Sequence, residues 1–259
     1  MKLISVYSIK GGVGKTAAAV NLAYLSARDG NRTLLWDLDP QSSATFYLRI
    51  QPRVKGGGKK LIRRKGDVND SIRGTDYDGF DLLPGDFSYR KFDLLLNETE
   101  KATKRLQQLR RRLQKEYDTL ILDCSPGFSL VAEALLKLSD LVLIPTVPTP
   151  LSLRSLELIG GYFEKKKLDT ERVRAFFSMV DRRKSLHRTV CEQTKGSPFR
   201  FLSPRIPYST FVEQMGVRRA PLATFAEKSP PARAFGELWR SIHTHLNPAH
   251  ARIRAGSAE

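Results

Sequence analysis

The chain has 259 residues, of which 41% are hydrophobic, and this composition excludes a globally disordered protein. No apolar run reaches the ~20 residues that a membrane-spanning helix needs. Cys124 and Cys191 have neither C-x-x-C nor metal-ligand spacing, so we expect a reduced, cytoplasmic protein. The net charge of +17, from 44 basic and 27 acidic residues, predicts a polyanionic partner, either nucleic acid or an anionic membrane surface.

The order of elements along the chain is typical of an α/β protein. An apolar stretch at 2–8 predicts a strand, and after a glycine-rich loop the residues 15–30 have a helical composition. A long helix is predicted at 99–116, where three leucines form one apolar stripe, and a last helix is predicted near the C-terminus. Further strands are predicted at 32–39, 78–85, 117–123, 139–150 and 173–181. This alternation predicts a mostly parallel, twisted sheet with helices on both faces.

The chain shows no internal repeat and no interdomain linker, so we predict one domain over residues 1–246. Residues 51–66 combine a run of three glycines with a basic cluster, which is typical of an exposed, mobile loop. Residues 247–259 are mostly polar and predict a frayed tail.

The stretch K-G-G-V-G-K-T at 10–16 stands between the first strand and the first helix, as phosphate binding requires. Its glycines allow backbone N–H groups to turn inward around an anion, and the positive end of the helix dipole adds to the attraction. Lys15 can reach the β- and γ-phosphates, and the Thr16 hydroxyl can ligate Mg²⁺. The stretch departs from the pattern G-x-x-x-x-G-K-[ST], because Ile9 occupies the first glycine position and Lys10 is an additional lysine.

Acidic residues follow two of the predicted strands. Asp123 ends an apolar run and is a candidate Mg²⁺ ligand. Asp37 and Asp39 end the second strand, where strand alternation places both on one side and Leu38 on the other. One of the pair could orient an attacking water, because phosphoryl transfer depends mainly on positioning and charge stabilisation. Either aspartate could instead cap a helix or bond within a loop.

These motifs resemble those of the ParA/MinD family of deviant Walker A ATPases. The resemblance rests on K-G-G-V-G-K-T at 10–16, D-L-D-P-Q at 37–41 and L-D-C-S-P at 122–126. The weaker matches L-L-P-G, M-V-D-R-R and R-I-P follow in the family's order at 82–85, 179–183 and 205–207. The resemblance covers most of the chain and implies a ParA-like ATPase domain with the P-loop NTPase fold.

The resemblance assigns a role to the additional lysine. Lys10 would be the signature lysine, which in this family reaches across a dimer interface to the phosphates of the other subunit. The resemblance therefore implies a homodimer that holds ATP between its subunits and loosens after hydrolysis to ADP. A second cation near the γ-phosphate stabilises most in a dry interface, where charges are poorly screened.

The same resemblance implies roles for the other site residues. The implied catalytic residues are Lys10, Lys15 and Asp39, of which Asp39 positions the attacking water. The implied Mg²⁺ ligands are Thr16 and Asp123, and Asp37 at the end of the second strand is a further candidate ligand. The implied nucleotide contacts are Gly11, Gly12, Val13, Gly14, Lys15, Thr16 and Ala17, with Met179 and Pro207 near the adenine. Ala17 replaces a threonine that is usual in the family, so one side-chain contact to the α-phosphate is lost.

Basic residues gather at 53–65, at 101–115 and in the C-terminal third, and the first two clusters contain no acidic residue. Together the clusters favour contacts to phosphate backbones without sequence reading, although a solvated surface would explain any one of them. ParA-like proteins bind DNA non-specifically as ATP dimers. We therefore expect a nucleoid-associated protein whose DNA contacts come from Lys195, Arg200, Arg218 and Arg219.

The predicted function is ATP-dependent partition or positioning of a plasmid, a chromosome region or a protein assembly, with hydrolysis stimulated by a ParB-like or adaptor protein. The main alternative is a MinD-like membrane-associated ATPase, although the tail after Leu246 lacks the amphipathic helix that this class needs. An iron-cluster scaffold ATPase would need more thiolate ligands, and Cys124 is more typical of a small buried apolar residue. A metabolic enzyme that phosphorylates a small acceptor is the third alternative.

Overall fold

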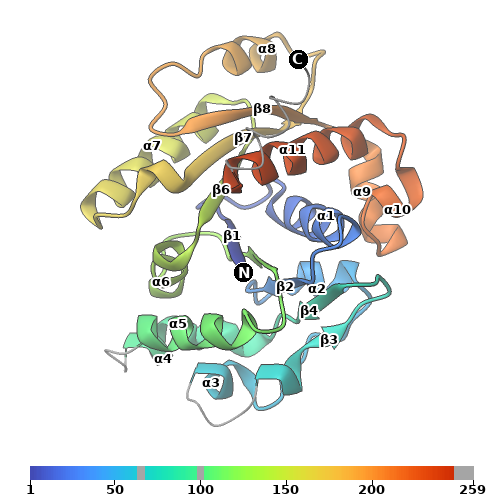
Figure 1. The fold of residues 1–259 in the computed structure, drawn as a ribbon. Coiled ribbons are helices and arrows are strands. Elements are labelled where there is room, and N and C mark those ends of the chain that lie inside the picture. Colours follow the sequence, from blue (N-terminus) through green and yellow to red (C-terminus); the bar gives the residue numbers. More distant parts are fainter. Residues whose placement is uncertain (63–67, 98–101, 248–259) are drawn as a thin grey trace, which may run out of the picture.

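The computed structural model describes residues 1–62, 68–97 and 102–247, which form one eight-stranded sheet with helices on both faces (Figure 1). The strand order is β3-β4-β2-β5-β1-β6-β7-β8, and every neighbouring pair is parallel except β3 with β4. The strands are β1 (Lys2–Val6), β2 (Thr33–Asp37), β3 (Arg73–Gly74), β4 (Phe80–Leu83), β5 (Thr119–Asp123), β6 (Leu141–Thr146), β7 (Val173–Val180) and β8 (Arg200–Pro207). The prediction of a mostly parallel sheet covered on both faces is confirmed.

The larger helices of the described residues cover the two faces of the sheet, whereas the helix Ser185–Glu192 packs in a separate small cluster with the end of β7. They are α1 (Lys15–Arg28), α2 (Ser43–Tyr47), α3 (Gly57–Ile62), α4 (Phe92–Asn97), α5 (Ala102–Leu113), α6 (Leu130–Leu138), α7 (Pro150–Lys165), α8 (Ser185–Glu192), α9 (Thr210–Arg218), α10 (Ala223–Ala226) and α11 (Pro230–Leu246). Short 3₁₀ turns occur at Val68–Ser71, Phe87–Lys91 and Thr170–Arg172. Figure 1 shows α1 and α11 on one side of the sheet and α5 and α6 on the other.

Side chains near the central strands alternate between two cores. Leu3 and Tyr7 pack into the core that α4 to α7 cover, whereas Ile4 and Val6 pack into the core that α1 and α11 cover. This alternation is the period of two expected for a strand buried on both faces. Because the central strands run parallel, their carboxyl ends meet at one edge of the sheet, where ligands bind in such folds.

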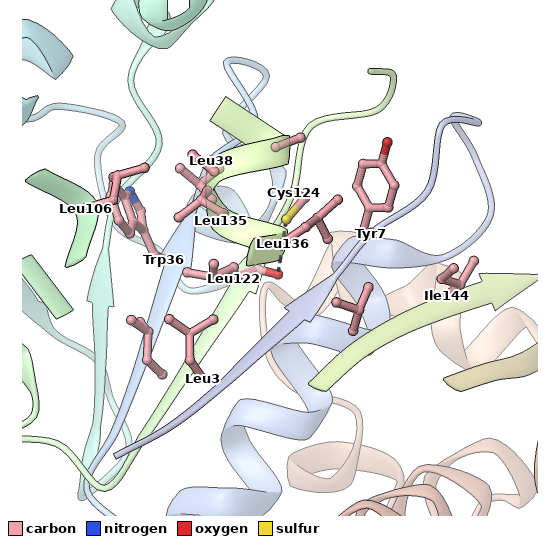
Figure 2. Close-up of a cluster of buried hydrophobic side chains, with 14 of the residues drawn as sticks. Leu3, Tyr7, Trp36, Leu38, Leu106, Leu122, Cys124, Leu135, Leu136 and Ile144 are labelled. Carbon is pink, nitrogen blue, oxygen red and sulfur yellow. Dashed lines mark hydrogen bonds between the residues drawn. The ribbon is translucent and has the colours of Figure 1, made fainter. Parts of the chain in front are cut away.

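Figure 2 shows the first core next to the loops that follow β1 and β5. Cys124 is 2% exposed and belongs to this core, together with Leu122 and Leu135, so its interpretation as a small buried apolar residue is confirmed. The hydroxyl of Tyr7 donates to the carbonyl oxygen of Gly127 at 3.1 Å. This bond anchors the loop after β5 to the core.

Helix starts follow from local sequence. The hydroxyl oxygen of Ser129 accepts a hydrogen bond from the amide of Ala132 at the start of α6, as an N-cap does. A proline occupies the first turn of α7 and of α11, where its missing N–H is not needed. The helix predicted at 99–116 is α5, and Leu106 and Leu113 of its apolar stripe are buried. Residues 98–101 lie outside the described residues.

The segment 51–66, predicted to be an exposed, mobile loop, is exposed over much of its described part but contains regular structure. Its described part contains the helix α3, and Val54 is only 3% exposed. Gly58 explains the difference, because a side chain at this position would collide with the ring of Phe92. Gly58 therefore lets the segment pack closely against α4. Residues 63–67 lie outside the described residues, as do residues 248–259 of the predicted tail.

The strand β8 has no counterpart among the predicted strands. Its sequence, R-F-L-S-P-R-I-P, contains two prolines and lacks a continuous apolar run. β8 stands at the edge of the sheet, where a residue without an N–H is tolerated. The register between β7 and β8 is irregular on both sides of the pair Phe177 and Arg205.

Candidate nucleotide-binding site

The glycine-rich loop lies at the carboxyl end of β1, directly before α1, as the motif predicts. Gly14 has a φ of +90°, and a Cβ atom there would lie 2.8 Å from the hydroxyl oxygen of Ser178. Glycine is therefore required at position 14 for both its backbone conformation and its lack of a side chain. Gly11 and Gly12 are exposed, and no atom lies within 4 Å of a Cβ built on either. The backbone here is open to a ligand.

Lys15 begins α1 and is only 7% exposed. Among the described residues, its ammonium donates to the carbonyl oxygen of Lys10 at 3.2 Å, and no carboxylate lies within ion-pair distance. Burial lowers the pKa of Lys15, while the charges of Asp123 and Asp39 oppose this shift. A buried cation that lacks an anionic partner, at the start of a helix and beside a glycine loop, suits a phosphate group.

Asp123 is the last residue of β5 and is 1% exposed. Neither of its carboxylate oxygens has a hydrogen-bond partner among the described residues. Burial raises the pKa of Asp123 well above its usual value, and the charge of neighbouring Asp37 adds to this shift, whereas Thr16 and Lys15 lower it in part. An unpartnered buried carboxylate beside a threonine hydroxyl fits a Mg²⁺ ion, which prefers hard oxygen ligands.

Asp37 lies opposite Asp123 in the register of β2 and β5, but its carboxylate is already occupied. Oδ2 accepts hydrogen bonds from the amide and hydroxyl of Thr45 at 2.9 and 2.6 Å, and Oδ1 accepts one from the amide of Asp39 at 3.2 Å. Burial raises the pKa of Asp37 to about 6, against these hydrogen bonds, which lower it. Of the predicted Mg²⁺ ligands, Asp123 is therefore the freer carboxylate.

Asp39 stands in the turn between β2 and α2 and is half-buried. Its Oδ1 accepts a hydrogen bond from the amide of Gln41 at 2.9 Å, while its other carboxylate oxygen has no such bond in the described part of the chain. Leu38, between the two aspartates, packs into the core that α4 to α7 cover, as strand alternation predicts. The Ser125 hydroxyl donates to the Leu38 carbonyl at 2.7 Å, and this bond joins the loops after β2 and β5.

The remaining predicted nucleotide contacts lie around the same edge of the sheet. Val13 is buried, whereas Lys10 and Ala17 are half-buried. Met179 lies near the end of β7, next to the Ser178 side chain that faces Gly14, and has a left-handed backbone with a φ of 56°. Pro207 ends β8 and pairs with Val180 in the sheet register. The roles assigned to Lys10, Met179 and Pro207 stay predictions.

Two residues of this site were missed by sequence reasoning. Thr45 is fully buried, and its hydroxyl oxygen also accepts a hydrogen bond from the amide of Gly85 at 2.8 Å. A Cβ atom at Gly85 would lie 2.5 Å from the hydroxyl oxygen of Ser42 and 3.0 Å from Oδ2 of Asp37. The weak motif L-L-P-G at 82–85 was the available signal for Gly85, whereas no pattern distinguishes Thr45.

The four predicted DNA contacts belong to two different surface features. Lys195 and Arg200 line an open hollow of about 590 Å³ near the start of β7 and β8, together with Arg174. β1 and β7 both run parallel to β6, so the start of β7 lies at the amino ends of the strands. The hollow is therefore at the opposite end of the strands from the glycine loop, which follows the carboxyl end of β1. Arg218 and Arg219 instead end α9 and contact residues near α2.

Arg174 is the member of the hollow that sequence reasoning missed. It pairs with Arg200 in the register of β7 and β8. Burial lowers the pKa of Arg174, and the charge of Arg200 lowers it further, while Glu171, which also lines the hollow, raises it in part. The Arg174 guanidinium donates to the carbonyl oxygens of Glu171 and Val173, and to no carboxylate in the described ranges. The hollow therefore carries excess positive charge.

Cys124 and Cys191 are both buried free thiols. Within the described residues, no group of three or more histidine, cysteine, aspartate or glutamate side chains is placed to hold a metal ion. The helices of the described ranges also include none that is long and apolar enough to span a membrane.

Known proteins resemble this chain over most of its length. The AAA domain family matches residues 1–172. The sporulation initiation inhibitor protein Soj of Bacillus subtilis is 31% identical, over 75% of this chain and 79% of its own length. The chromosome partitioning protein ParA of Myxococcus xanthus is 26% identical, over 98% of this chain and 92% of its own length.

A solved structure of a Cyanothece McdA–ATP complex has the same fold. It is 20% identical in sequence and superimposes with a TM-score of 0.80, covering 94% of this chain and 96% of its own. The family match, the Soj likeness and the glycine loop agree, and they show that the chain belongs to the ParA/MinD family of deviant Walker A ATPases.

Proposed function

We propose that this protein is a Mg²⁺-dependent ATPase that dimerises around ATP, binds DNA non-specifically and positions a cargo on the nucleoid. The observation that carries the proposal is the pair of buried charges beside the glycine loop. Lys15 lacks an anionic partner and Asp123 lacks any hydrogen-bond donor among the described residues. A triphosphate bound with a divalent cation supplies what each side chain is missing.

Each residue of the site has a distinct task in this proposal. The amides of the glycine loop and the ammonium of Lys15 bind the phosphates, and Thr16 and Asp123 hold Mg²⁺ with Asp37 beside them. When bound, the ion neutralises phosphate charge during transfer. Asp39 has a carboxylate oxygen left over from its bond to Gln41, and it accepts a hydrogen bond from the attacking water.

Dimerisation follows from the additional lysine. Lys10 is half-buried at the glycine loop, and its carbonyl oxygen accepts the Lys15 hydrogen bond. In the proposed dimer, the Lys10 ammonium contacts phosphates held by the other subunit, as the family resemblance implies. ADP lacks the γ-phosphate, so hydrolysis removes part of this attraction and releases the subunits.

DNA binding is supported by the net charge of +17 and by the hollow that Arg174, Lys195 and Arg200 line. Arginine and lysine side chains without acidic partners bind phosphate backbones and read no sequence. Arg218 and Arg219 supply a second cationic surface. The name of the relative ParA, a chromosome partitioning protein, supports partition as the wider role, and the family resemblance implies that a ParB-like or adaptor protein stimulates hydrolysis.

The proposal is tested by the binding of Asp39→Ala protein to random-sequence DNA, with ATP and with ADP, over a salt series. We expect binding with ATP that weakens steeply as salt rises, because each neutralised phosphate releases counterions. The variant should also hydrolyse little ATP. Normal ATP hydrolysis by Asp39→Ala would show that Asp39 does not position the attacking water. Dimerisation without DNA binding in either nucleotide would refute the nucleoid-binding part, and liposome binding by the same protein would favour a MinD-like role.

A further inference from the structure

We propose that helix α2 connects the cationic surface at the end of α9 to Asp37, so that a polyanion bound at Arg218 and Arg219 stabilises the hydrogen-bonded arrangement of the hydrolysis site. This inference rests on the proposed function, because it takes DNA as the polyanion and the glycine-loop edge as the site of hydrolysis. It adds a coupling between DNA binding at Arg218 and Arg219 and the geometry of the hydrolysis site at Asp37.

One end of the connection is the bond between α2 and the strand β2. Thr45 donates its amide and its hydroxyl to the same carboxylate oxygen of Asp37, at 2.9 and 2.6 Å. The amide of Gly85 then donates to the Thr45 hydroxyl oxygen at 2.8 Å. The position of α2 therefore fixes the Asp37 carboxylate, which faces Asp123 in the sheet register.

The other end is the next residue of α2. The carbonyl oxygen of Phe46 accepts a hydrogen bond from Nε of Arg219 at 3.0 Å. The Arg219 guanidinium also lies 4.7 Å from the centre of the Phe46 ring, within the range of a cation–π contact. Consecutive residues of one short helix thus hold Asp37 on one side and Arg219 on the other.

Arg49 completes the connection from the opposite direction. Its Nε donates to the carbonyl oxygen of Arg219 at 3.1 Å, and its Nη2 donates to that of Arg218 at 3.0 Å. Only a guanidinium has donors in the fixed fork that reaches both carbonyls. Arg49 therefore joins the segment after α2 to the end of α9 without being one of the proposed DNA contacts.

The backbone around α2 indicates that this arrangement is held in place by its contacts. Ser42 precedes α2 with a φ of 55°, Arg49 follows it with a φ of 60°, and Arg219 ends α9 with a φ of 50°. Residues other than glycine rarely adopt this left-handed conformation, because it brings Cβ close to the backbone. Loss of the contacts would let these residues relax, and in our proposal this relaxed position is the second arrangement of α2.

A polyanion is the ligand that can act on this connection. The hydrogen bonds of the Arg219 guanidinium in the described part of the chain use Nε, which leaves its Nη groups able to donate to a phosphate while the Phe46 contact persists. Arg218 is exposed beside it. A phosphate bound here favours the arrangement in which Arg219 lies over Phe46, and by linkage it favours the bonds of Thr45 to Asp37.

Amide hydrogen exchange of the α2 segment tests the inference. The protein is loaded with AMPPNP, so that its nucleotide and dimer state stay constant, and a short random-sequence DNA duplex is added at low salt. In the wild type we expect DNA to slow exchange at Thr45 and Gly85 about fivefold, the lower range of measured site-to-site couplings. In Arg49→Lys we expect normal DNA binding, because the charge is kept, and no slowing, because the fork is lost.

Arg28→Lys is the matched control, since Arg28 is also exposed but pairs with Glu227 at 3.1 Å, away from α2, and it should keep the fivefold slowing. Phe46→Leu is a second variant that removes the ring under Arg219, and it should also lose the slowing. The inference is overturned if wild type binds DNA without slowing, or if both link variants keep it. Failure of the wild type to bind DNA at all overturns the proposed function as well, and the binding curve alone distinguishes that result.

Discussion

Two acids of this protein, the buried Asp123 and the partly buried Glu133, have opposite surroundings. Asp123 has no hydrogen-bond donor on either carboxylate oxygen among the described residues, and burial raises its pKa well above the usual value. The Glu133 side chain is 13% exposed and pairs with Lys137 at 2.7 Å and Lys166 at 2.8 Å, and the Tyr162 hydroxyl donates to it at 3.0 Å. The difference separates a carboxylate without an internal partner among the described residues, for which we propose Mg²⁺ binding, from one that joins two helices.

The same contrast holds for the lysines. Lys137 and Lys166 are partly exposed and share one acid, whereas Lys15 is buried and donates to a backbone carbonyl. A protein usually pairs its buried structural charges with internal groups, because removing a charge from water without giving it a partner costs free energy. Charges left unsatisfied at the glycine loop therefore mark the place where ligand binding supplies the missing partner.

The largest effect is expected at Lys15. Lys15→Ala should weaken ATP binding about 100-fold, because truncating a buried charge pair costs 2–5 kcal/mol in measured complexes. Nucleotide affinity measured by calorimetry checks this expectation. The control is Lys137→Ala, which removes the same charge from the paired cluster and should leave ATP affinity unchanged. Equal losses of ATP affinity in the two variants would contradict the assignment of Lys15 to ligand binding and of Lys137 to a structural cluster.

Asp123→Asn should separate folding from metal binding. Without Mg²⁺, we expect the variant to be more stable than the wild type by about 2 kcal/mol, because burial of the Asp123 charge costs more than Thr16 and Lys15 offset. With Mg²⁺, it should lose the metal-dependent part of its ATP affinity. Chemical denaturation and ATP titration, each with and without Mg²⁺, give both quantities.

Asp37→Asn is the matched control for this prediction. Burial raises the pKa of Asp37 to about 6, but its carboxylate accepts hydrogen bonds from Thr45 and Asp39, and Asn loses part of these. The lost hydrogen bonds should offset most of the gain from removing the charge, so we expect the stability of the metal-free protein to change by less than about 1 kcal/mol. An equal gain in the two variants would contradict the distinction between a free and an occupied carboxylate.

The hollow at the other sheet edge is a third kind of charge cluster, open to solvent and mostly cationic. Replacing Arg174 and Arg200 together by glutamine should lower DNA affinity about tenfold at low salt and reduce the salt slope by about 2. Filter binding over a salt series measures both values. Arg154→Gln is the control, because Arg154 pairs with Glu157 at 2.7 Å. An unchanged slope in the double variant would move DNA binding to the Arg218 and Arg219 surface.

Sequence reasoning predicted the parts of the molecule that rest on short local patterns. The glycine loop, the positions of Asp37 and Asp123 at strand ends, and the parallel sheet all follow from residues that are close together in the chain. The connection of Thr45 to Asp37 joins residues eight positions apart through a tight turn, and no pattern announces it. β8 escaped prediction because its prolines suit an edge strand only, and edge position is a property of the whole sheet.

The hollow shows that sequence patterns also fail to predict which basic residues the fold brings together. Lys195 and Arg200 were predicted from the basic C-terminal third together with the family resemblance, but Arg174 joins them only through the pairing of β7 with β8. Basic residues at 53–65 and 101–115 look equally favourable in the sequence, yet Lys55 pairs with Asp70 and Arg110 with Asp140. Composition reveals the excess charge, whereas the fold decides which cations remain without an acid.

The smallest effect is expected at Glu133 and depends on pH. Burial alone would raise the pKa of Glu133, but hydrogen bonds from Lys137, Lys166 and Tyr162 outweigh it and bring the pKa down to about 2. Because the folded-state pKa is below the ordinary value of 4.5, the charged form favours folding. This contribution is fully present above about pH 4.5 and is lost as the pH falls toward 2.

Glu133→Gln should therefore lower the free energy of unfolding by about 1 kcal/mol at neutral pH, and the difference from wild type should shrink steadily below pH 4.5. Urea denaturation at several pH values measures this difference, and ATP affinity should be unchanged at neutral pH, because the cluster joins α6 to α7 and holds no ligand. A variant that loses ATP affinity while its stability is unaffected would place Glu133 with Asp123 among the ligand-binding acids. Satisfied pairing would then no longer identify a structural charge in this protein.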